Sequence, residues 1–325
     1  MDLFKSYQKE FKTSLEKFIL NKSPQNLYRP MAYILDLGGK RVRPYLCLMA
    51  AEVYGISPLK SMGAAMSLEI FHNFTLMHDD IMDKAPLRRG NKTVHEKWDV
   101  NTAILSGDAM LIRAYQSIEC YPSDIFLKLT KLLSKTAIEV CEGQQYDLDF
   151  ETASIVSEGE YMKMIRLKTA VLVGCALKMG AIIGGASAKD TAAIYDFGIH
   201  LGLAFQLQDD YLDAFGDQMT FGKKIGGDII ENKKTILYHL ALKKANLKQS
   251  DLLKSLMKVD LSHSDEDKIS KIKGLFEDTG AKEATKQAIF FHGDLAIKKL
   301  EKIAIGAKQK ASFLGLKDWL MNRTY

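Results

Sequence analysis

The segment LEIFHNFTLMHDDIMD, residues 68–83, joins an apolar, helix-like stretch to an acidic motif of the form D-D-x-x-D. The same form ends a second segment, IHLGLAFQLQDDYLD at residues 199–213. Residues four apart on a helix lie on one face, so the first and last aspartate of each motif point the same way. The two segments therefore predict two helices, each with a pair of carboxylates near its C-terminus.

Stability alone does not favour these carboxylate pairs. Like charges four residues apart destabilise a helix by roughly 0.2–0.5 kcal/mol. Pro86 and Gly216 follow the two motifs, which places the carboxylates near helix C-termini, where they oppose the helix dipole. A hard cation reverses both penalties, because Mg²⁺ takes oxygen ligands, usually one or two carboxylates plus waters and phosphate oxygens. The alternative is two solvated acidic helix ends, and the matched pair of motifs argues against it.

Composition narrows the class of protein. The 325 residues are 47% hydrophobic and 26% charged, which is ordinary for a globular chain with a sizeable core. The net charge of +5 is too mild to predict nucleic-acid binding. No apolar run approaches 18 residues, so no membrane span is expected, and no signal peptide is predicted at the N-terminus. The cysteines form no C-x-x-C pair and have apolar neighbours, which predicts buried thiols in a reducing cytoplasm; they are Cys47, Cys120, Cys141 and Cys175.

Proline distribution indicates the fold class. All six prolines lie within residues 24–122, and the absence of proline afterwards favours long uninterrupted helices. Ser23-Pro24 and Ser57-Pro58 predict helix N-caps followed by a first-turn proline. Period-2 strand patterns are weak throughout. The sequence therefore predicts a single all-α domain over residues 1–325, with about ten to fifteen helices.

Basic clusters accompany the acidic motifs. Arginine forks and lysine ammonium groups bind phosphate oxygens, so carboxylates for metal ions and cations for phosphates together predict a site for a diphosphate ester. Any one cluster alone could be an ordinary solvated loop. His78 is interpreted as structural, and no nucleophile motif or Walker A loop is present. The clusters are GGKRVRP at 38–44, LRRG at 87–90, RLKT at 166–169, and GKKIGGD at 222–228 continuing to NKKT at 232–235.

In this order the motifs resemble the trans-isoprenyl diphosphate (polyprenyl) synthases, a family that includes farnesyl and geranylgeranyl diphosphate synthases. Residues 246–325 carry no motif that matches. The resemblance implies an all-α, isoprenoid-synthase-type helical bundle around a deep central cavity, usually as a homodimer. It also implies that the two aspartate motifs face each other across the mouth of this cavity. The motifs that carry the resemblance are the four basic clusters, both aspartate motifs, Gly107-Asp108, and Gly143-Gln144 to Asp147.

The resemblance also implies the roles of site residues. About three Mg²⁺ ions would be held by Asp79, Asp83 and Asp209, with Asp80, Asp210 and Asp213 supporting through waters. The allylic diphosphate would be held by Arg88, Lys168, Thr169, Gln206, Lys223 and Lys233. The diphosphate of isopentenyl diphosphate would be held by Lys40, Arg43, His72 and Arg89. The six aspartates with Lys168 and Lys233 form the implied catalytic set.

The implied reaction condenses isopentenyl diphosphate with dimethylallyl, geranyl or farnesyl diphosphate. It proceeds by ionisation, condensation and elimination, and no side chain is an obvious base. A longer-chain polyprenyl synthase and a non-catalytic subunit of a heteromeric synthase are alternatives; both aspartate motifs are intact, which argues against the subunit. A class I terpene cyclase would lack the isopentenyl diphosphate site, so Lys40, Arg43 and Arg89 argue against it.

Product length is predicted from the helix before the first motif. Thr75 and Phe74 lie four and five residues before Asp79, roughly 6–7.5 Å along the helix. The Phe74 ring could form the floor beneath the growing chain, whereas Thr75 is too small. An aromatic residue at the fifth position alone resembles short-chain geranylgeranyl synthases. We therefore expect geranylgeranyl diphosphate as the main product, with farnesyl diphosphate second; core packing of Phe74, or a floor at Met110 or Tyr115, are alternatives.

Overall fold

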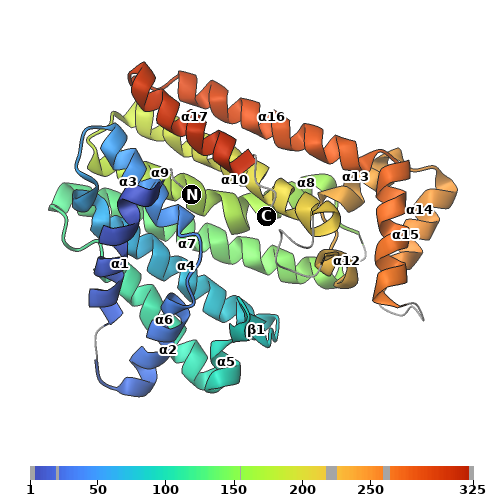
Figure 1. Cartoon of the computed structure of the whole chain (residues 1–325), viewed down its shortest axis with the longest axis horizontal. Coiled ribbons are helices and arrows are strands. Elements are labelled where there is room, and N and C mark those ends of the chain that lie inside the picture. Colours follow the sequence, from blue (N-terminus) through green and yellow to red (C-terminus); the bar gives the residue numbers. More distant parts are fainter. Residues whose placement is uncertain (1–3, 20–21, 154, 217–224, 259–263, 322–325) are drawn as a thin grey trace. The chain divides into compact units, whose positions relative to one another are not determined.

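Figure 1 shows a computed structural model of the chain, and it confirms the predicted all-α fold class. Among the described residues the only strands form one short hairpin, β1 (Leu87–Arg88) with β2 (Asn91–Lys92). The described residues are 4–19, 22–153, 155–216, 225–258 and 264–321. The helices are α1 (Lys5–Ile19), α2 (Gln25–Asp36), α3 (Val42–Val53), η2 (Pro58–Ser61), α4 (Met62–Met82), α5 (Val94–Lys97), α6 (Val100–Gln116), α7 (Ser123–Thr152), α8 (Glu158–Ile165), η3 (Arg166–Ala170), α9 (Val171–Ile183), α10 (Ala188–Phe215), α12 (Gly227–Ile230), α13 (Ile236–Lys244), α14 (Leu247–Leu256), α15 (Asp265–Asp278), α16 (Ala281–Glu301) and α17 (Ala307–Met321).

The chain divides into two compact units. The first unit contains residues 1–135 and 175–192, and the second contains residues 136–174 and 193–325. The boundaries fall within α7, α9 and α10, so each of these helices contributes residues to both units. The single domain over residues 1–325 stays a prediction.

Helix α4 is the centre of the first unit. It packs against α6, α3 and α2, and it buries apolar residues on every side, including Leu68, Ile70 and Met77. A helix that is apolar all round is expected to lie in a core. This packing fixes the axis of the helix that carries the first aspartate motif.

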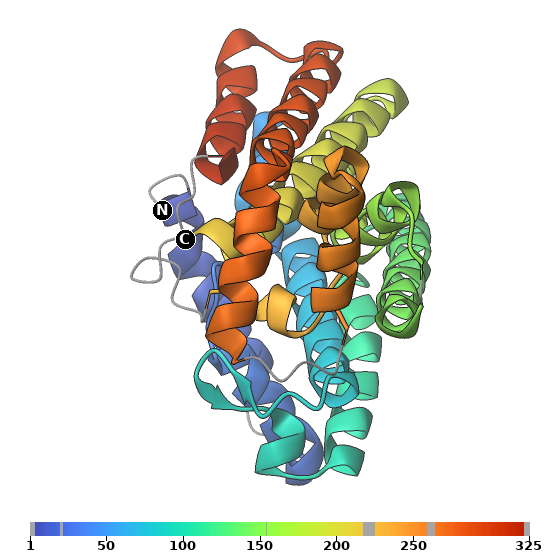
Figure 2. The same ribbon diagram turned by 90° about the vertical axis from the view of Figure 1, so that its right-hand side faces the viewer.

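The C-terminal helices organise the second unit. Helix α16 packs against α13, α15 and α17, and α12 packs against α15. Helices α16 and α17 lie side by side in both ribbon views (Figures 1 and 2). Thus residues 246–325, which carry no recognised motif, form much of the support of the second unit.

The long helices predicted from the proline distribution are largely confirmed. Helix α7 has 30 residues, α10 has 28 and α16 has 21. Ser57 is the N-cap residue of the 3₁₀ helix η2 and Pro58 is its first residue, as predicted. The prediction for Ser23-Pro24 is wrong by one residue, because Pro24 has an extended backbone (ψ 142°) and α2 starts only at Gln25.

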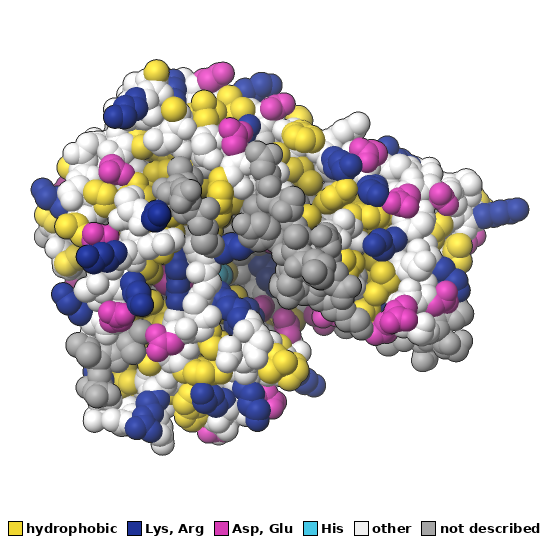
Figure 3. Space-filling view, viewed as in Figure 1, with side chains coloured by type: hydrophobic (Ala, Val, Ile, Leu, Met, Phe, Trp, Pro, Cys, Tyr) yellow, Lys and Arg dark blue, Asp and Glu magenta, His cyan; other side chains and the backbone are white. Residues whose placement is uncertain are grey.

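The prediction of buried thiols is half correct. Cys47 and Cys175 are buried, but Cys120 and Cys141 are exposed. Cys120 lies in the turn after α6, where its Sγ contacts the carbonyl oxygen of Ser117 at 3.6 Å, and apolar neighbours in the sequence did not reveal that position. No described helix is long and apolar enough to cross a membrane. On the face in Figure 3, charged side chains of both signs are interspersed with hydrophobic ones.

Candidate active site

The first aspartate motif lies at the C-terminus of α4, as predicted. The helix ends at Met82, and Asp83 is the C-cap residue, with its backbone N–H bonded to the carbonyl oxygen of Asp79 at 2.9 Å. Asp79 and Asp83 are therefore one turn apart on the same helix end. The Asp79 side chain is 21% exposed, and Asp83 is exposed.

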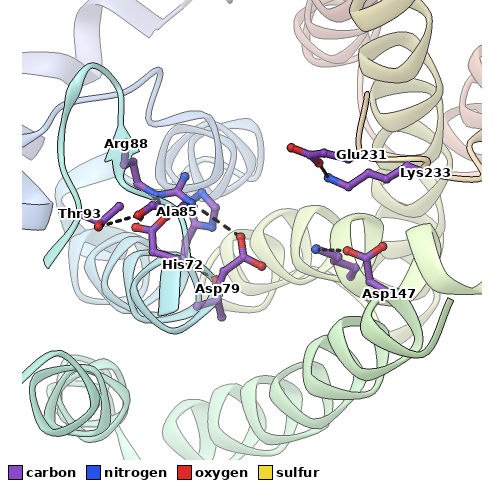
Figure 4. A network of polar contacts seen from close by, with 11 residues as sticks. His72, Asp79, Ala85, Arg88, Thr93, Asp147, Glu231 and Lys233 are labelled. Carbon is purple, nitrogen blue, oxygen red and sulfur yellow. Dashed lines mark hydrogen bonds and ion pairs between the residues drawn. The ribbon is translucent and has the colours of Figure 1, made fainter. Parts of the chain in front are cut away.

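Asp80 is buried and forms an ion pair with Arg88. The Arg88 Nε lies 2.9 and 2.8 Å from the two carboxylate oxygens of Asp80, and its Nη2 lies 2.7 Å from Oδ1. The same Nη2 is 3.7 Å from Oδ2 of Asp79. The β1–β2 hairpin carries Arg88, and a bond from Thr93 Oγ1 to the carbonyl oxygen of Ala85 (2.7 Å) closes its base (Figure 4). Arg88 thus contacts the motif from outside the helix.

A glycine turn makes room for the second arginine of the hairpin. Gly38 and Gly39 both have positive φ angles, 80° and 125°. A Cβ at Gly39 would lie 2.8–2.9 Å from the guanidinium of Arg89, which is closer than side chains tolerate. Arg89 donates a hydrogen bond to the carbonyl oxygen of Gly38. The two glycines therefore allow Arg89 to lie directly on the 38–44 segment.

Arginines also surround His72 of α4. The Arg43 Nη1 lies 3.1 Å from Nε2 of His72. Burial, and then the charges of Arg43 and Arg89, hold the pKa of His72 well below its usual range. The imidazole is therefore neutral, and its Nε2 accepts the hydrogen bond from Arg43. Lys40 is half-buried in the same segment.

One buried carboxylate compensates part of this positive charge. Arg41, the N-cap residue of α3, pairs with Glu69, which is 2% exposed and also accepts a bond from Asn73 (2.6 Å). Burial and the charge of Arg41 lower the pKa of the Arg89 guanidinium. An anion bound at Arg89 would relieve this crowding of positive charges.

In the second unit a pocket of about 160 Å³ is lined by Lys168 of the third cluster and by Lys233 and Lys234 of the fourth. One wall is the π-helical turn η3, which contains Lys168 and Thr169. Such turns are often found at functional sites. A Cβ at Gly143 of α7 would lie 2.2 Å from the backbone nitrogen of Lys168, so this glycine permits α7 to touch the turn.

Two of the lysines that line the pocket, Lys168 and Lys233, contact carboxylates. Lys168 Nζ lies 2.5 Å from Asp147, and Lys233 Nζ lies 2.6 Å from Glu231 and 3.8 Å from Asp228 (Figure 4). Burial alone would lower the pKa of Lys233, but the bond to Glu231 and the charge of Asp228 raise it above its usual value. Lys233 is therefore charged, and ion pairs hold both side chains at the pocket wall.

The second aspartate motif ends α10, where Asp210 forms a buried network. Its oxygens accept hydrogen bonds from the Tyr161 hydroxyl and from Nε2 of Gln206 (3.1 Å), and Thr169 Oγ1 donates to Oε1 of Gln206 (3.0 Å). Burial and the charge of Asp228 raise the pKa of Asp210 to about 8. Burial and the neighbouring negative charge therefore favour the protonated form of this carboxyl.

The other two aspartates of the motif, Asp209 and Asp213, are less buried than Asp210. Asp209 is only partly buried. Asp213 accepts a bond from the backbone N–H of Asp228 (3.0 Å), which links the motif to α12. These carboxylates are accessible to a hydrated cation, whereas Asp210 is enclosed.

The donor chemistry of both motifs fits a hard cation. Asp79, Asp83 and Asp209 offer carboxylate oxygens that are at least partly exposed. In the parts of the chain that are described, no three His, Cys, Asp or Glu side chains gather at one point as a complete metal site. Magnesium usually takes only one or two carboxylates from a protein, and waters and phosphate oxygens complete its shell.

The structure brings together some of the site residues that were predicted from the sequence. The first unit joins Arg43, His72 and Arg89, and the second joins Lys168, Thr169, Gln206 and Lys233 in its pocket. Lys223 lies outside the described residues. Three residues that contact the site were not predicted from the sequence: Glu69, Tyr161 and Glu231. Glu69 was detectable as an isolated acid in an apolar run, but nothing in the sequence distinguished Tyr161 from other tyrosines.

Phe74 lies on the buried side of α4. It is 8% exposed, and its ring centroid is 5.6 Å from Phe71 and 4.8 Å from His78. Thr75 is half-buried and donates from Oγ1 to the carbonyl oxygen of His72 (2.8 Å). Of the two positions, only Phe74 presents a large apolar group.

The helical fold and the two sets of acidic and basic side chains define an all-α enzyme of the isoprenoid-synthase type. A polyprenyl synthetase family model matches residues 24–275. The short chain isoprenyl diphosphate synthase of Methanothermobacter thermautotrophicus is 35% identical over all of this chain and 99% of that protein. The geranylgeranyl diphosphate synthase of Methanosarcina mazei is 39% identical over 75% of this chain and 76% of that protein. A crystal structure of a geranylgeranyl pyrophosphate synthase is similar, with a TM-score of 0.94, 51% identity and 98% coverage of both chains. The chain belongs to the polyprenyl synthetase family and is a prenyltransferase.

Proposed function

We propose that the chain condenses isopentenyl diphosphate with an allylic diphosphate and makes geranylgeranyl diphosphate as its main product. The observation that carries the proposal is the presence of two separate basic clusters, one in each unit, each accompanied by an aspartate motif. A two-substrate reaction of diphosphates needs two anion sites. Relatives named geranylgeranyl diphosphate synthases support the product.

The cluster in the second unit is proposed to hold the allylic diphosphate. Lys168 and Lys233 line one pocket with Thr169 and Gln206. By its motif position in the sequence, Lys223 is proposed to bind the same diphosphate. Both described lysines contact carboxylates of the protein, so an incoming diphosphate would exchange one anion for another. By its motif position Arg88 is proposed to bind the same diphosphate, and it also pairs with Asp80.

The cluster in the first unit is proposed to hold isopentenyl diphosphate. Arg43, Arg89 and Lys40 supply the positive charge, and neutral His72 accepts the hydrogen bond that positions the Arg43 guanidinium. Arg89 supports this assignment most strongly, because it lies near Arg41 and Arg88 and its guanidinium is held against a glycine turn. A fixed guanidinium suits a bidentate phosphate contact.

Magnesium is the proposed cofactor, with Asp79, Asp83 and Asp209 as its ligands and Asp80, Asp210 and Asp213 as their support. When bound, Mg²⁺ supplies the Lewis acidity that stabilises negative charge on a leaving diphosphate. The basic residues hold the diphosphate and share that charge. The allylic carbon–oxygen bond breaks with its electrons going to the diphosphate, the alkene then forms the new carbon–carbon bond, and a proton is lost. No side chain is assigned as the base.

Product length is assigned to Phe74. Its ring is large, buried and one to two helical turns before Asp79, which supports a floor beneath a chain of limited length. A longer product is one alternative, because some relatives are named geranylfarnesyl diphosphate synthases. Farnesyl diphosphate is the other alternative.

We also propose a homodimer in the cytoplasm, with each chain acting as a single domain. On α6 the residues facing α4 are small or buried, whereas Ile104, Leu105 and Ile112 are 42–61% exposed. A second copy of the chain would cover this apolar face. Sedimentation of the protein and of Leu105→Glu tests the dimer, since the variant is expected to sediment as a monomer.

The function is tested by incubating the protein with labelled isopentenyl diphosphate, dimethylallyl diphosphate and Mg²⁺, followed by analysis of product length. The expected result is a twenty-carbon prenyl diphosphate as the main product. A main product of fifteen or twenty-five carbons would correct the product but keep the reaction class. If no condensation occurs with dimethylallyl diphosphate, or when geranyl or farnesyl diphosphate replaces it, the proposal is contradicted and a non-catalytic subunit is favoured.

A further inference from the structure

Helix α6 has a notch where it crosses α4. Gly107 is buried, and a Cβ at this position would lie 2.2 Å from Nε2 and 2.5 Å from Cδ2 of His78. Real Cβ atoms essentially never approach other atoms below 3.0 Å. The imidazole of His78 therefore occupies space that only glycine leaves open.

The imidazole is also held by a hydrogen bond. Nε2 of His78 lies 3.2 Å from the carbonyl oxygen of Ile104, one turn before Gly107 on α6. Since a carbonyl oxygen only accepts, Nε2 must carry the proton. Asp108 is farther away, with its Oδ1 at 3.9 Å. The notch and the hydrogen bond together fix the ring in one orientation.

The fixed imidazole in turn contacts Phe74. The two residues are four apart on α4, and their rings meet edge to face, with centroids 4.8 Å apart and an interplanar angle of 67°. Phe71 contacts the Phe74 ring at 5.6 Å. The Phe74 ring is thus held between an aromatic residue one turn before it and His78 one turn after it.

We infer that His78 and Gly107 are specificity-determining residues for product length: the notch at Gly107 seats His78, and His78 holds the Phe74 ring in place. This inference rests on the proposed function, in which Phe74 limits the growing chain. It gives His78 a role beyond the structural one expected from the sequence. It also explains why a glycine is needed at position 107 of a long helix, where it costs stability relative to alanine.

The test compares product lengths of Gly107→Ala, His78→Ala and the double variant with those of the unchanged protein. The added methyl group would lie 2.2 Å from Nε2, so the His78 ring must move away from it, and His78→Ala removes the ring. Either change loses an aromatic contact, so the fraction of products longer than the main one should rise by about threefold to tenfold. In the double variant the methyl group meets no ring, so its products should match those of His78→Ala.

Gly274→Ala is the matched control. Gly274 lies inside α15 with no atom within 4 Å of an added Cβ, so this variant should leave the product distribution unchanged. Product ratios are read from whatever turnover remains, so a lower rate next to Asp79 does not affect the test. If Gly107→Ala does not fold, His78→Ala, which creates no clash, decides the question by itself.

Phe74→Ala distinguishes the proposed floor at Phe74 from the proposed support of that ring by His78. If it lengthens the products while His78→Ala and Gly107→Ala do not, Phe74 is the floor and the proposed support by His78 is wrong. If Phe74→Ala leaves product length unchanged, the floor lies elsewhere. In that case a change in His78→Ala alone would overturn the inferred route through Phe74.

Discussion

The two aspartate motifs share one sequence pattern and one position at a helix end, yet their middle aspartates are stabilised in different ways. Asp80 forms an ion pair with Arg88, with three N–O distances of 2.7–2.9 Å. Asp210 accepts hydrogen bonds from two neutral groups, Tyr161 and Gln206. The first unit thus supplies its own positive charge to the motif, whereas the described contacts of Asp210 supply only neutral donors.

This difference extends to other buried groups of the two units. In the first unit Glu69 is also paired with an arginine, Arg41. In the second unit the partly buried His200 and His292 share a contact of 3.2 Å between their Nδ1 atoms, and burial lowers the pKa of both. The shared D-D-x-x-D pattern therefore does not determine how the middle aspartate is stabilised.

The largest expected effect tests whether the motifs nevertheless act together. Asp79→Ala and Asp209→Ala should each lower kcat/KM by about a thousandfold or more, because each removes a proposed metal ligand and its stabilisation of the leaving group. Steady-state assays with Mg²⁺ measure the loss, and circular dichroism checks that each variant is folded. A chelator should abolish turnover of the unchanged protein reversibly. Full activity in chelator, or in either variant, would contradict the metal assignment.

The middle aspartates test the comparison directly. Asp80→Asn should lower the free energy of unfolding by about 3 kcal/mol, because it leaves the Arg88 charge beside a neutral amide. Asp210→Asn should cost about 1 kcal/mol or less at pH 7, since an amide can replace a protonated carboxyl between Tyr161 and Gln206. Denaturant unfolding without metal measures both. Equal losses would show that the two sites are stabilised alike.

The basic clusters should separate the two substrates. Arg89→Ala and Lys40→Ala should raise the KM for isopentenyl diphosphate, and Lys168→Ala and Lys233→Ala should raise that for the allylic diphosphate. Loss of a charge-assisted contact costs about 1.5–3 kcal/mol, or roughly tenfold to 150-fold in affinity. Varying one substrate while the other is saturating measures each effect. If all four variants weakened both substrates equally, the assignment of one cluster to each substrate would be wrong.

The smallest expected effect concerns the histidine pair of the second unit. Burial, followed by the charge of His200, lowers the pKa of His292 to about 4, while Lys299, Asp196 and Arg166 surround His200. The unfolded chain, with an ordinary histidine pKa near 6.5, then binds a proton that the folded chain does not. Stability should therefore fall as the pH drops from about 6.5 to 4.

His292→Asn should reduce this pH dependence. Melting temperatures at pH 7 and pH 5 measure it in both proteins, and the difference between the two pH values should be smaller in the variant. An unchanged difference would mean that other groups cause the acid sensitivity.

Much of the fold was predictable from the sequence. The apolar runs before both motifs and the absence of proline after residue 122 predicted long helices, and α7, α10 and α16 confirm them. The helix ends at Asp83 and near Gly216 were also predictable, because local signals set them. Exposure of Cys120 was not, since it depends on which neighbours cover a turn.

By itself, the sequence determined the residue types of the site and their order, which is why the aspartate motifs and basic clusters identified the family. Only the tertiary structure decided the partners: Arg88 for Asp80, Tyr161 for Asp210, and the notch at Gly107 for His78. The physical reason is the distance along the chain over which each kind of interaction acts. Helical periodicity and turn residues act over a few positions along the chain, whereas an ion pair or a steric notch depends on which helices meet, and that contact is set by the packing of the whole unit.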